Sequence, residues 1–145
     1  MTVVIKGTIF QKPGKFGDFN WMISRPEYND ALFIFNDNVE DHHTNKLGGG
    51  NAIVRPYNKY GNGKIRSAGI PTGSKGNGFR VLNQETKKII DDAILEIKDI
   101  IKNDNTIKTV YYSKNPGTFL VGTGLFTVNI EVIKYITKCI LELNK

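Results

Sequence analysis

The sequence contains one cysteine and no long hydrophobic run. An internal disulfide is therefore excluded, and Cys139 lies in a helical pattern beside Ile136 and Ile140, which indicates core packing rather than a catalytic thiol. No apolar stretch approaches the roughly 20 residues that a membrane-spanning helix requires. The first residues also lack the apolar stretch of a secretory signal. We therefore expect a protein that stays in the cytoplasm and has no membrane partner.

Two further absences exclude common kinds of site. Only two histidines, His42 and His43, accompany the single cysteine, so the sequence offers no credible zinc-ligand pattern, and we expect no metal and no other cofactor. We expect the histidine pair to be exposed to solvent or, as the alternative, to supply a base or a substrate contact. The loop over residues 69–76 superficially resembles a Walker phosphate loop, but it has no Gly-Lys-Ser/Thr at the required spacing. This excludes a P-loop nucleoside triphosphatase.

Acidic residues are too few to balance the basic ones. The chain has 14 Asp and Glu against 20 Lys and Arg, which gives a formal net charge of +6. This excess favours an anionic partner such as a nucleotide, a nucleic acid or an acidic membrane surface. Charge alone does not choose among these partners, and a Lys-, Asn- and Ile-rich composition is also expected from an AT-rich genome.

The length and hydrophobic content predict one domain over residues 1–145. A chain of 145 residues is long enough for one core and short for two, and 39% hydrophobic residues is close to the globular norm. Nine of the 15 glycines lie between residues 48 and 78, so this segment is expected to consist mainly of loops. Within it, residues 52–55 fit either a helical turn or a strand.

The remaining pattern alternates strands with helices. Strands are predicted over residues 3–10, 31–35 and 107–113, with a brief one at 67–71. The continuous apolar run 31–35 is typical of a strand buried on both faces. Isoleucines at helical spacing predict an amphipathic helix over about 84–102, and a final helix is expected after a cap at Asn129. This order favours an α/β layered fold with its ligand crevice outside the carboxyl ends of the strands.

Two loops that follow predicted strands carry the candidate ligand-binding residues. Glycines let a backbone approach an oxyanion closely, and carboxamides both donate to and accept from ribose hydroxyls. A Gly-x-Gly turn between a strand and a helix is a common phosphate-binding arrangement. A mobile surface loop is the alternative reading of the first loop. The candidates in the first loop are Asn36, Asp37, Asn38, Gly48, Gly49, Gly50 and Asn51, and those in the second are Gly122, Thr123, Gly124, Leu125 and Phe126.

Taken together, these segments resemble the macro domain superfamily, which binds ADP-ribose and in many members processes it. The family has an apolar strand ending in Asn-Ala-Ala-Asn, then a Gly-Gly-Gly run, and later a small-Thr-Gly loop before a terminal helix. Similar features stand here in the same order over residues 30–145. The resemblance implies a three-layer domain with a mixed, mostly parallel sheet flanked by helices. The Asn-Asp-Asn, Gly-Gly-Gly-Asn-Ala and Gly-Ile-Pro-Thr-Gly segments also resemble a set of small phage and giant-virus proteins, which implies a host-cytoplasmic location.

The resemblance also implies residue roles. Asn36 or Asn38 would contact the distal ribose, the Gly48–Gly50 backbone would flank it, and residues 122–126 would wrap the diphosphate. The family's Gly-Asp-Ile, whose Asp reads adenine, has no match at the first strand. Here Asp18 stands in a later Gly-Asp-Phe and is the remaining candidate for this contact. The Asp that the hydrolytic branch places after the glycine run is also missing.

Three functions follow from these features. The leading hypothesis is that the chain binds ADP-ribose or a related NAD-derived nucleotide, as a reader or as a sponge for a nucleotide signal. The second is an ADP-ribosyl hydrolase or ADP-ribose-1″-phosphate phosphatase that uses Asp37, Asn38 or His43. The third is nonspecific nucleic-acid binding through the basic excess, with Tyr57, Tyr60 and Arg66 interleaved. The oligomeric state is not predicted.

Overall fold

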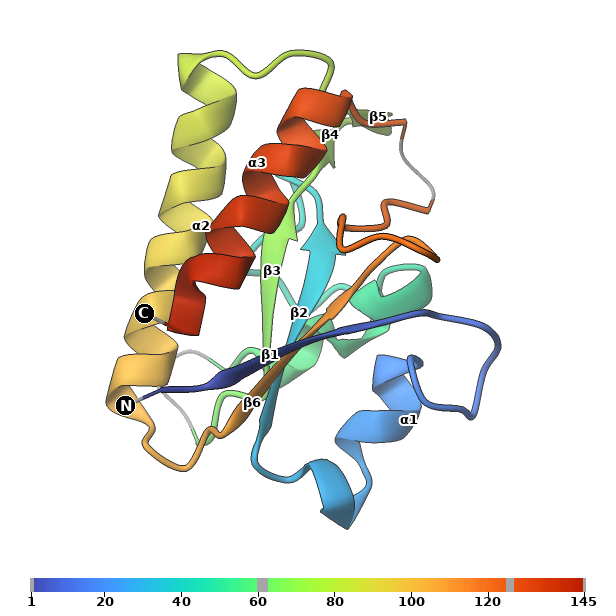
Figure 1. Ribbon diagram of the computed structural model, residues 1–145, viewed down its shortest axis with the longest axis vertical. Helices are drawn as coiled ribbons and strands as arrows, with labels where there is room; N and C mark the ends of the chain where they lie inside the picture. Colours follow the sequence, from blue (N-terminus) through green and yellow to red (C-terminus); the bar gives the residue numbers. More distant parts are fainter. Residues whose placement is uncertain (1, 60–62, 125–126, 145) are drawn as a thin grey trace.

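The computed structural model describes residues 2–59, 63–124 and 127–144 (Figure 1). Its main sheet has four strands in the order β1-β6-β2-β3: β1 (Val4–Thr8), β6 (Thr109–Ser113), β2 (Ala31–Asp37) and β3 (Ser67–Pro71). All three pairings in this sheet are parallel, so the four carboxyl ends point the same way. Each strand was predicted within a few residues. The described antiparallel pairings are a short hairpin of β4 (Gly73–Ser74) and β5 (Asn77–Gly78) and a bridge between Lys114 and Val121.

Strand β2 occupies the centre of the sheet because its side chains are apolar on both faces. Leu32 and Ile34 belong to one hydrophobic cluster, whereas Phe33 and Phe35 belong to a second cluster on the opposite face. All four side chains are at most 3% exposed. The continuous apolar run 31–35 is therefore part of a strand that is buried on both faces, as predicted.

Two long helices cover the first face of the sheet. Helix α2 (Gln84–Asn103) and helix α3 (Ile130–Leu141) lie side by side there (Figure 1). Each begins at an asparagine cap: the Asn83 side chain accepts a hydrogen bond from Thr86 N–H and the Asn129 side chain accepts one from Glu131 N–H. Both helices were predicted because their isoleucines and valines repeat at helical spacing and are buried against the sheet.

Shorter elements cover the other face. These are α1 (Phe19–Ile23) and the 3₁₀ helices η1 (Pro26–Tyr28) and η2 (Gly50–Tyr57); a further 3₁₀ turn, η3 (Glu142–Asn144), follows α3. The sequence analysis assigned residues 19–23 to no element because a five-residue helix is too short to show a period. For residues 52–55, η2 confirms the helical alternative.

The molecule is thus an α/β structure with a parallel four-stranded sheet and helices packed on it. Among the described residues, no helix combines the length and the hydrophobicity needed to cross a membrane. The two faces differ in size: the cluster under α2 and α3 contains 20 buried residues, and the cluster under α1 and η2 contains nine.

Candidate functional site

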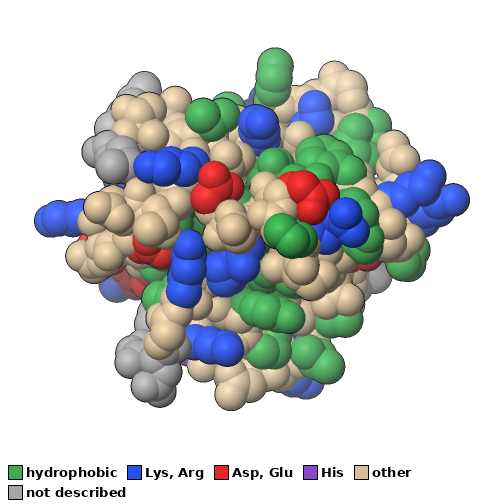
Figure 2. All heavy atoms as spheres, turned by 90° about the horizontal axis from the view of Figure 1, so that it is seen from below, with side chains coloured by type: hydrophobic (Ala, Val, Ile, Leu, Met, Phe, Trp, Pro, Cys, Tyr) green, Lys and Arg blue, Asp and Glu red, His purple; other side chains and the backbone are tan. Residues whose placement is uncertain are grey.

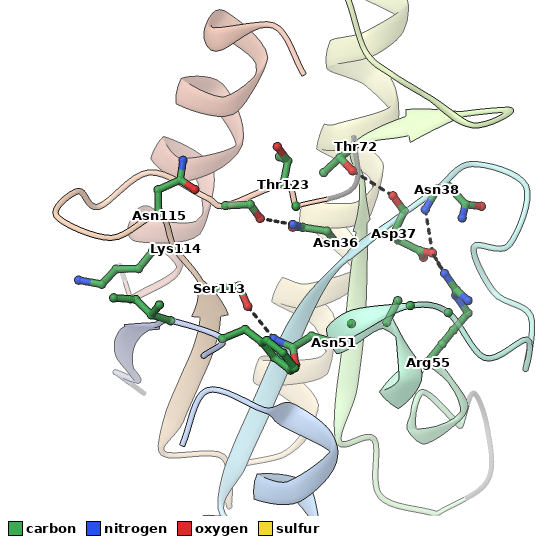
Figure 3. Close-up of a pocket in the computed structure, with 18 of the residues that line it drawn as sticks. Asn36, Asp37, Asn38, Asn51, Arg55, Thr72, Ser113, Lys114, Asn115 and Thr123 are labelled. Carbon is green, nitrogen blue, oxygen red and sulfur yellow. Dashed lines mark hydrogen bonds and ion pairs between the residues drawn. The ribbon is translucent and has the colours of Figure 1, made fainter. Parts of the chain in front are cut away.

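A cavity of about 420 Å³ opens at the carboxyl ends of the parallel strands (Figure 3). Every strand of the main sheet contributes to its wall through the residues at or just beyond its end. These are Ile9 and Phe10 after β1, residues 36–38 at the end of β2, Thr72 after β3, and residues 113–116 at the end of β6. Two glycine-bearing segments complete the lining, residues 48–52 with Arg55, and residues 122–124. We call this cavity the crevice.

The crevice unites the two loops that the sequence analysis singled out. The Asn36 side-chain amide donates a hydrogen bond to the Gly122 carbonyl, across 86 positions of the chain (Figure 3). Gly122 N–H in turn donates to the Ser113 carbonyl at 3.0 Å, which ties the second loop to the end of β6. Loops that follow β2 and β6 therefore lie against each other because these strands are neighbours in the sheet.

Asn51 lies in the crevice wall, but its carboxamide is occupied by structural hydrogen bonds. Its oxygen accepts from Phe19 N–H at 2.9 Å, and its nitrogen donates to the Ser113 hydroxyl at 2.7 Å and to the Gly17 carbonyl at 3.2 Å. One side chain thus joins the starts of α1 and η2 to the end of β6. Asn51 shapes the crevice and is not available to match ribose hydroxyls without breaking these bonds.

Asn38 also holds the backbone. Its side-chain oxygen accepts from Asp41 N–H at 2.8 Å, and its own N–H donates to the Asp37 carboxylate at 2.9 Å. These bonds fix the turn that leaves β2, because an Asn side chain can replace a backbone carbonyl in a turn. What the first loop presents to the crevice is therefore chiefly backbone and the Asn36 side chain.

Glycine stands in the crevice wall for two different physical reasons. A Cβ at Gly48 would lie 2.5 Å from the Ala52 Cβ, so the close approach of the loop to η2 requires glycine. Gly50 and Gly124 instead have left-handed φ values of 56° and 52°, and a Cβ there would meet nothing within 4 Å. These two glycines border open space, and η2 begins at Gly50 with N–H groups that have no acceptor within the helix.

Behind the crevice floor, acidic and basic side chains contact one another in a chain. The Asp37 carboxylate is 3% exposed and accepts two hydrogen bonds from the Arg55 guanidinium, at 3.0 and 2.6 Å. His42 Nδ1 lies 2.7 Å from the other Asp37 oxygen, and His42 Nε2 lies 2.9 Å from the Glu96 carboxylate. His43 Nε2 also contacts Glu96.

These contacts set the charge of each group. Burial disfavours ionised Asp37, but hydrogen bonds from His42 and Arg55 outweigh burial and lower the pKa of its carboxyl below the ordinary value. Burial likewise lowers the pKa of His42, but Asp37 and Glu96 outweigh it and raise that pKa to about 9. At neutral pH, Asp37 is a carboxylate whose lone pairs are already engaged, which is a poor starting state for a general base.

Most of the predicted ligand-binding residues line this one cavity. They are Asn36, Asp37, Asn38, Gly48, Gly49, Gly50, Asn51, Gly122, Thr123 and Gly124. Leu125 and Phe126 lie outside the described residues. His43 does not line the crevice; it lies on the far side of Asp37, beside a small second cavity.

Asp18 lies outside the crevice wall. It was a candidate for an adenine contact, but it does not line the crevice. Its carboxylate caps α1 by accepting from Asn20 N–H at 3.1 Å, and its second oxygen accepts from Gly14 N–H at 2.8 Å. A short side chain at the start of a helix does this commonly, so the Gly-Asp-Phe sequence reflects a helix start.

Several residues of the crevice wall were not predicted from the sequence. Arg55, Thr72, Ser113, Lys114 and Asn115 line the crevice but were not proposed as site residues. Polar residues directly after a predicted strand were a usable signal for the last four, because parallel strands end at one edge. Arg55 had no such signal, since its position depends on how η2 packs on the sheet.

Comparisons with known proteins do not identify the chain: no protein-family model, no curated protein and no solved structure matches it. The site therefore has to be interpreted from its own chemistry. A concave cavity at the carboxyl edge of a parallel sheet, walled by glycine backbone and polar side chains, has the form of a small-molecule site.

Proposed function

We propose that the crevice binds a phosphorylated small molecule of the ADP-ribose class, as a reader or as a sponge for a nucleotide signal. One observation carries this proposal: two glycine-bearing loops more than 70 residues apart, at 48–51 and 122–124, line a single cavity of about 420 Å³. That volume lies within the roughly 300–1,000 Å³ that is usual for small-ligand sites.

The crevice supplies groups suited to an anion. The first N–H groups of η2 carry the positive end of the helix dipole, and they begin in the glycine run that lines the cavity. The glycine backbone allows an oxyanion to come close because no Cβ intervenes at the open positions Gly50 and Gly124. Lys114 in the wall adds a cation. Asn36 supplies a polar side chain for a sugar hydroxyl, whereas the buried Thr72 hydroxyl donates to the Asp37 carbonyl.

Binding without turnover fits these side chains better than hydrolysis does. Of the three catalytic candidates, the Asp37 carboxylate is engaged by Arg55 and His42, Asn38 holds a turn, and His43 lies outside the crevice. Hydrolase or phosphatase activity remains the alternative, and incubation with ADP-ribosylated protein or ADP-ribose-1″-phosphate tests it by product release.

Isothermal titration calorimetry with ADP-ribose, cyclic ADP-ribose and NAD tests the proposal directly. We expect saturable heat with at least one of them, and no heat with any at millimolar ligand would overturn the proposal. The variant Lys114→Glu should weaken binding by about fivefold, because reversing a partly exposed charge changes an anion's interaction by about 1 kcal/mol. Lys134→Glu is the matched control, since Lys134 is an exposed lysine of α3 away from the crevice and the change in net charge is identical.

Nucleic-acid binding has less support. Arg66 is not presented to solvent as a phosphate contact: its guanidinium donates to the carbonyls of Ala31, Ile23 and Tyr28 at 3.2, 3.4 and 2.7 Å. Tyr60 lies outside the described residues. Figure 2 shows Lys and Arg side chains interspersed with hydrophobic and acidic ones on the face seen from below Figure 1. Affinity for oligonucleotides that collapses with added salt and ignores ADP-ribose would favour this alternative.

A further inference from the structure

A second cluster of chemically capable side chains lies behind the crevice floor and is not used by the proposed function. His42 and His43 stand on the turn after β2, and Glu96 stands on α2, 54 and 53 positions further along the chain. One ligand atom from each of the three lies within 4.8 Å of the others. We propose that these three residues bind a divalent transition-metal ion, with Zn²⁺ as the representative ion.

The choice of donor atoms supports this ion class. Two imidazole nitrogens and one carboxylate oxygen form a ligand set that suits Zn²⁺ and its neighbours Co²⁺ and Ni²⁺, whereas Ca²⁺ and Mg²⁺ prefer oxygen ligands alone. The two imidazole rings lie 4.1 Å apart between centroids, so both can direct a nitrogen to one point beside Glu96. No cysteine is required for this site.

The surroundings of His42 are those of a prepared ligand. Metal-binding histidines commonly donate the hydrogen on their other ring nitrogen to a carboxylate, which fixes the ring and its tautomer. Here Asp37 accepts from His42 Nδ1 at 2.7 Å, and Arg55 holds Asp37 in place from its other side. This leaves His42 Nε2 directed at Glu96 as the metal-binding atom.

The backbone conformation of His43 also helps to bring the two imidazole rings and Glu96 together. His43 has a φ of 70°, and Lys75 is the other non-glycine residue in the described chain with a positive φ. A positive φ is uncommon for a non-glycine residue, although histidine adopts it more readily than most side chains. This conformation places the His43 ring beside Glu96, and the side chain is half exposed, so water has access to complete the coordination of an ion held by three protein ligands.

A bound ion would connect two distant parts of the fold. The turn that carries His42 and His43 begins at Asn38, in the crevice floor. Glu96 belongs to α2, and α2 and η2 cover opposite faces of the sheet. The ion binds an Nε2 atom that carries no proton. An Nε2 proton of a charged ring would therefore pass to solvent, and an Nε2 proton of a neutral ring would move to Nδ1. Its role would be to fix the turn at the crevice floor. The inference does not depend on which nucleotide the crevice binds.

The test uses the 145-residue chain without an affinity tag. Co²⁺ binding is followed by the visible absorption of a low-symmetry site, Zn²⁺ binding by competition against Co²⁺, and stability by thermal melting with and without Zn²⁺. We expect a one-to-one stoichiometry and a rise in melting temperature with Zn²⁺, because an ion that binds only the folded state stabilises it. His43→Ala and Glu96→Gln should each weaken binding by at least about tenfold, since even outer-shell changes typically cost about 10- to 100-fold.

Asp41→Asn is the matched control. Asp41 lies on the same turn, and its carboxylate pairs loosely with Lys46 at 3.8 Å rather than with the histidines. This variant removes a nearby negative charge but no ligand, so its affinity should equal that of the unsubstituted chain. If Co²⁺ produces no absorption and Zn²⁺ produces no shift in melting temperature, the three side chains form ion pairs with one another and bind no metal. Equal binding by Glu96→Gln would show adventitious surface binding. Either result would overturn the proposal.

Discussion

Asp37 is the residue on which both sides of the crevice floor depend. One carboxylate oxygen accepts from Arg55 and from Asn38 N–H, and the other accepts from His42. Its backbone carbonyl accepts from Thr72 N–H at 2.9 Å, which continues the pairing of β2 with β3. Gly69 is required beside it, because a Cβ there would lie 2.4 Å from an Asp37 oxygen. Asp37 is thus better described as the anchor of the site than as its base.

Arg55→Met should strongly destabilise the fold. The pair that Arg55 forms with Asp37 has side-chain exposures of 3% and 1%, so the substitution leaves a buried carboxylate without its main partner. Breaking such a pair typically costs about 3–5 kcal/mol in the free energy of unfolding. Urea denaturation followed by circular dichroism measures it.

Arg25→Met provides the control for Arg55→Met. Arg25 and Glu27 also pair, at 3.0 Å, but their side chains are 43% and 54% exposed. Solvent screens an exposed pair, so this substitution should change the free energy of unfolding far less than Arg55→Met does. Similar losses in the two variants would contradict the view that burial makes the Asp37 pair important.

At the scale of elements, predictability followed length and periodicity. Helices α2 and α3 and strand β2 were found from the sequence because many consecutive side chains repeat the pattern of one buried face. Helix α1 was not, since five residues do not complete two turns. Helix η2 was left open between two alternatives because Pro56 and the glycine run obscure any period.

Asn83→Ala should test the capping that defines the start of α2. The Asn83 side chain accepts from Thr86 N–H at 2.9 Å, and an unsatisfied N–H at a helix start is unfavourable. We expect a loss of about 1 kcal/mol in the free energy of unfolding. Lys98→Ala, at an exposed position in the middle of the same helix, should change stability by less than about 0.5 kcal/mol. If the Asn83→Ala and Lys98→Ala variants unfold at the same urea concentration, the Asn83 cap contributes nothing measurable to stability.

At the scale of the whole molecule, the candidate site was predicted in outline but not in its contacts. The order of the elements suggests a parallel sheet, and parallel strands end at one edge. The meeting of the two loops could therefore be predicted. The use of Asn51 and Asn38 as backbone supports does not follow, because the partner atoms come from segments far apart in the sequence or depend on the exact turn. The same holds for Glu96: nothing near His42 and His43 in the sequence indicates a third ligand 53 positions later.

The two faces of the sheet should differ in local stability. The cluster between the sheet and the two long helices α2 and α3 has 20 buried residues. The cluster between the sheet and the shorter α1 and η2, of five and eight residues, has nine. Regions with fewer buried contacts open at a lower free-energy cost than the global transition. We therefore expect the α1 and η2 face to open first.

Hydrogen exchange measured by mass spectrometry at increasing denaturant checks this expectation. Amides of α1 and η2 should exchange through an opening of lower free energy than amides of α2 and the central strand β2, which should exchange only on global unfolding. Because η2 forms a wall of the crevice, a saturating ligand should slow exchange in η2 and leave α2 unchanged. Equal protection of both faces without ligand would mean that the smaller cluster folds as one unit with the larger, and the crevice wall would then be rigid before any ligand arrives.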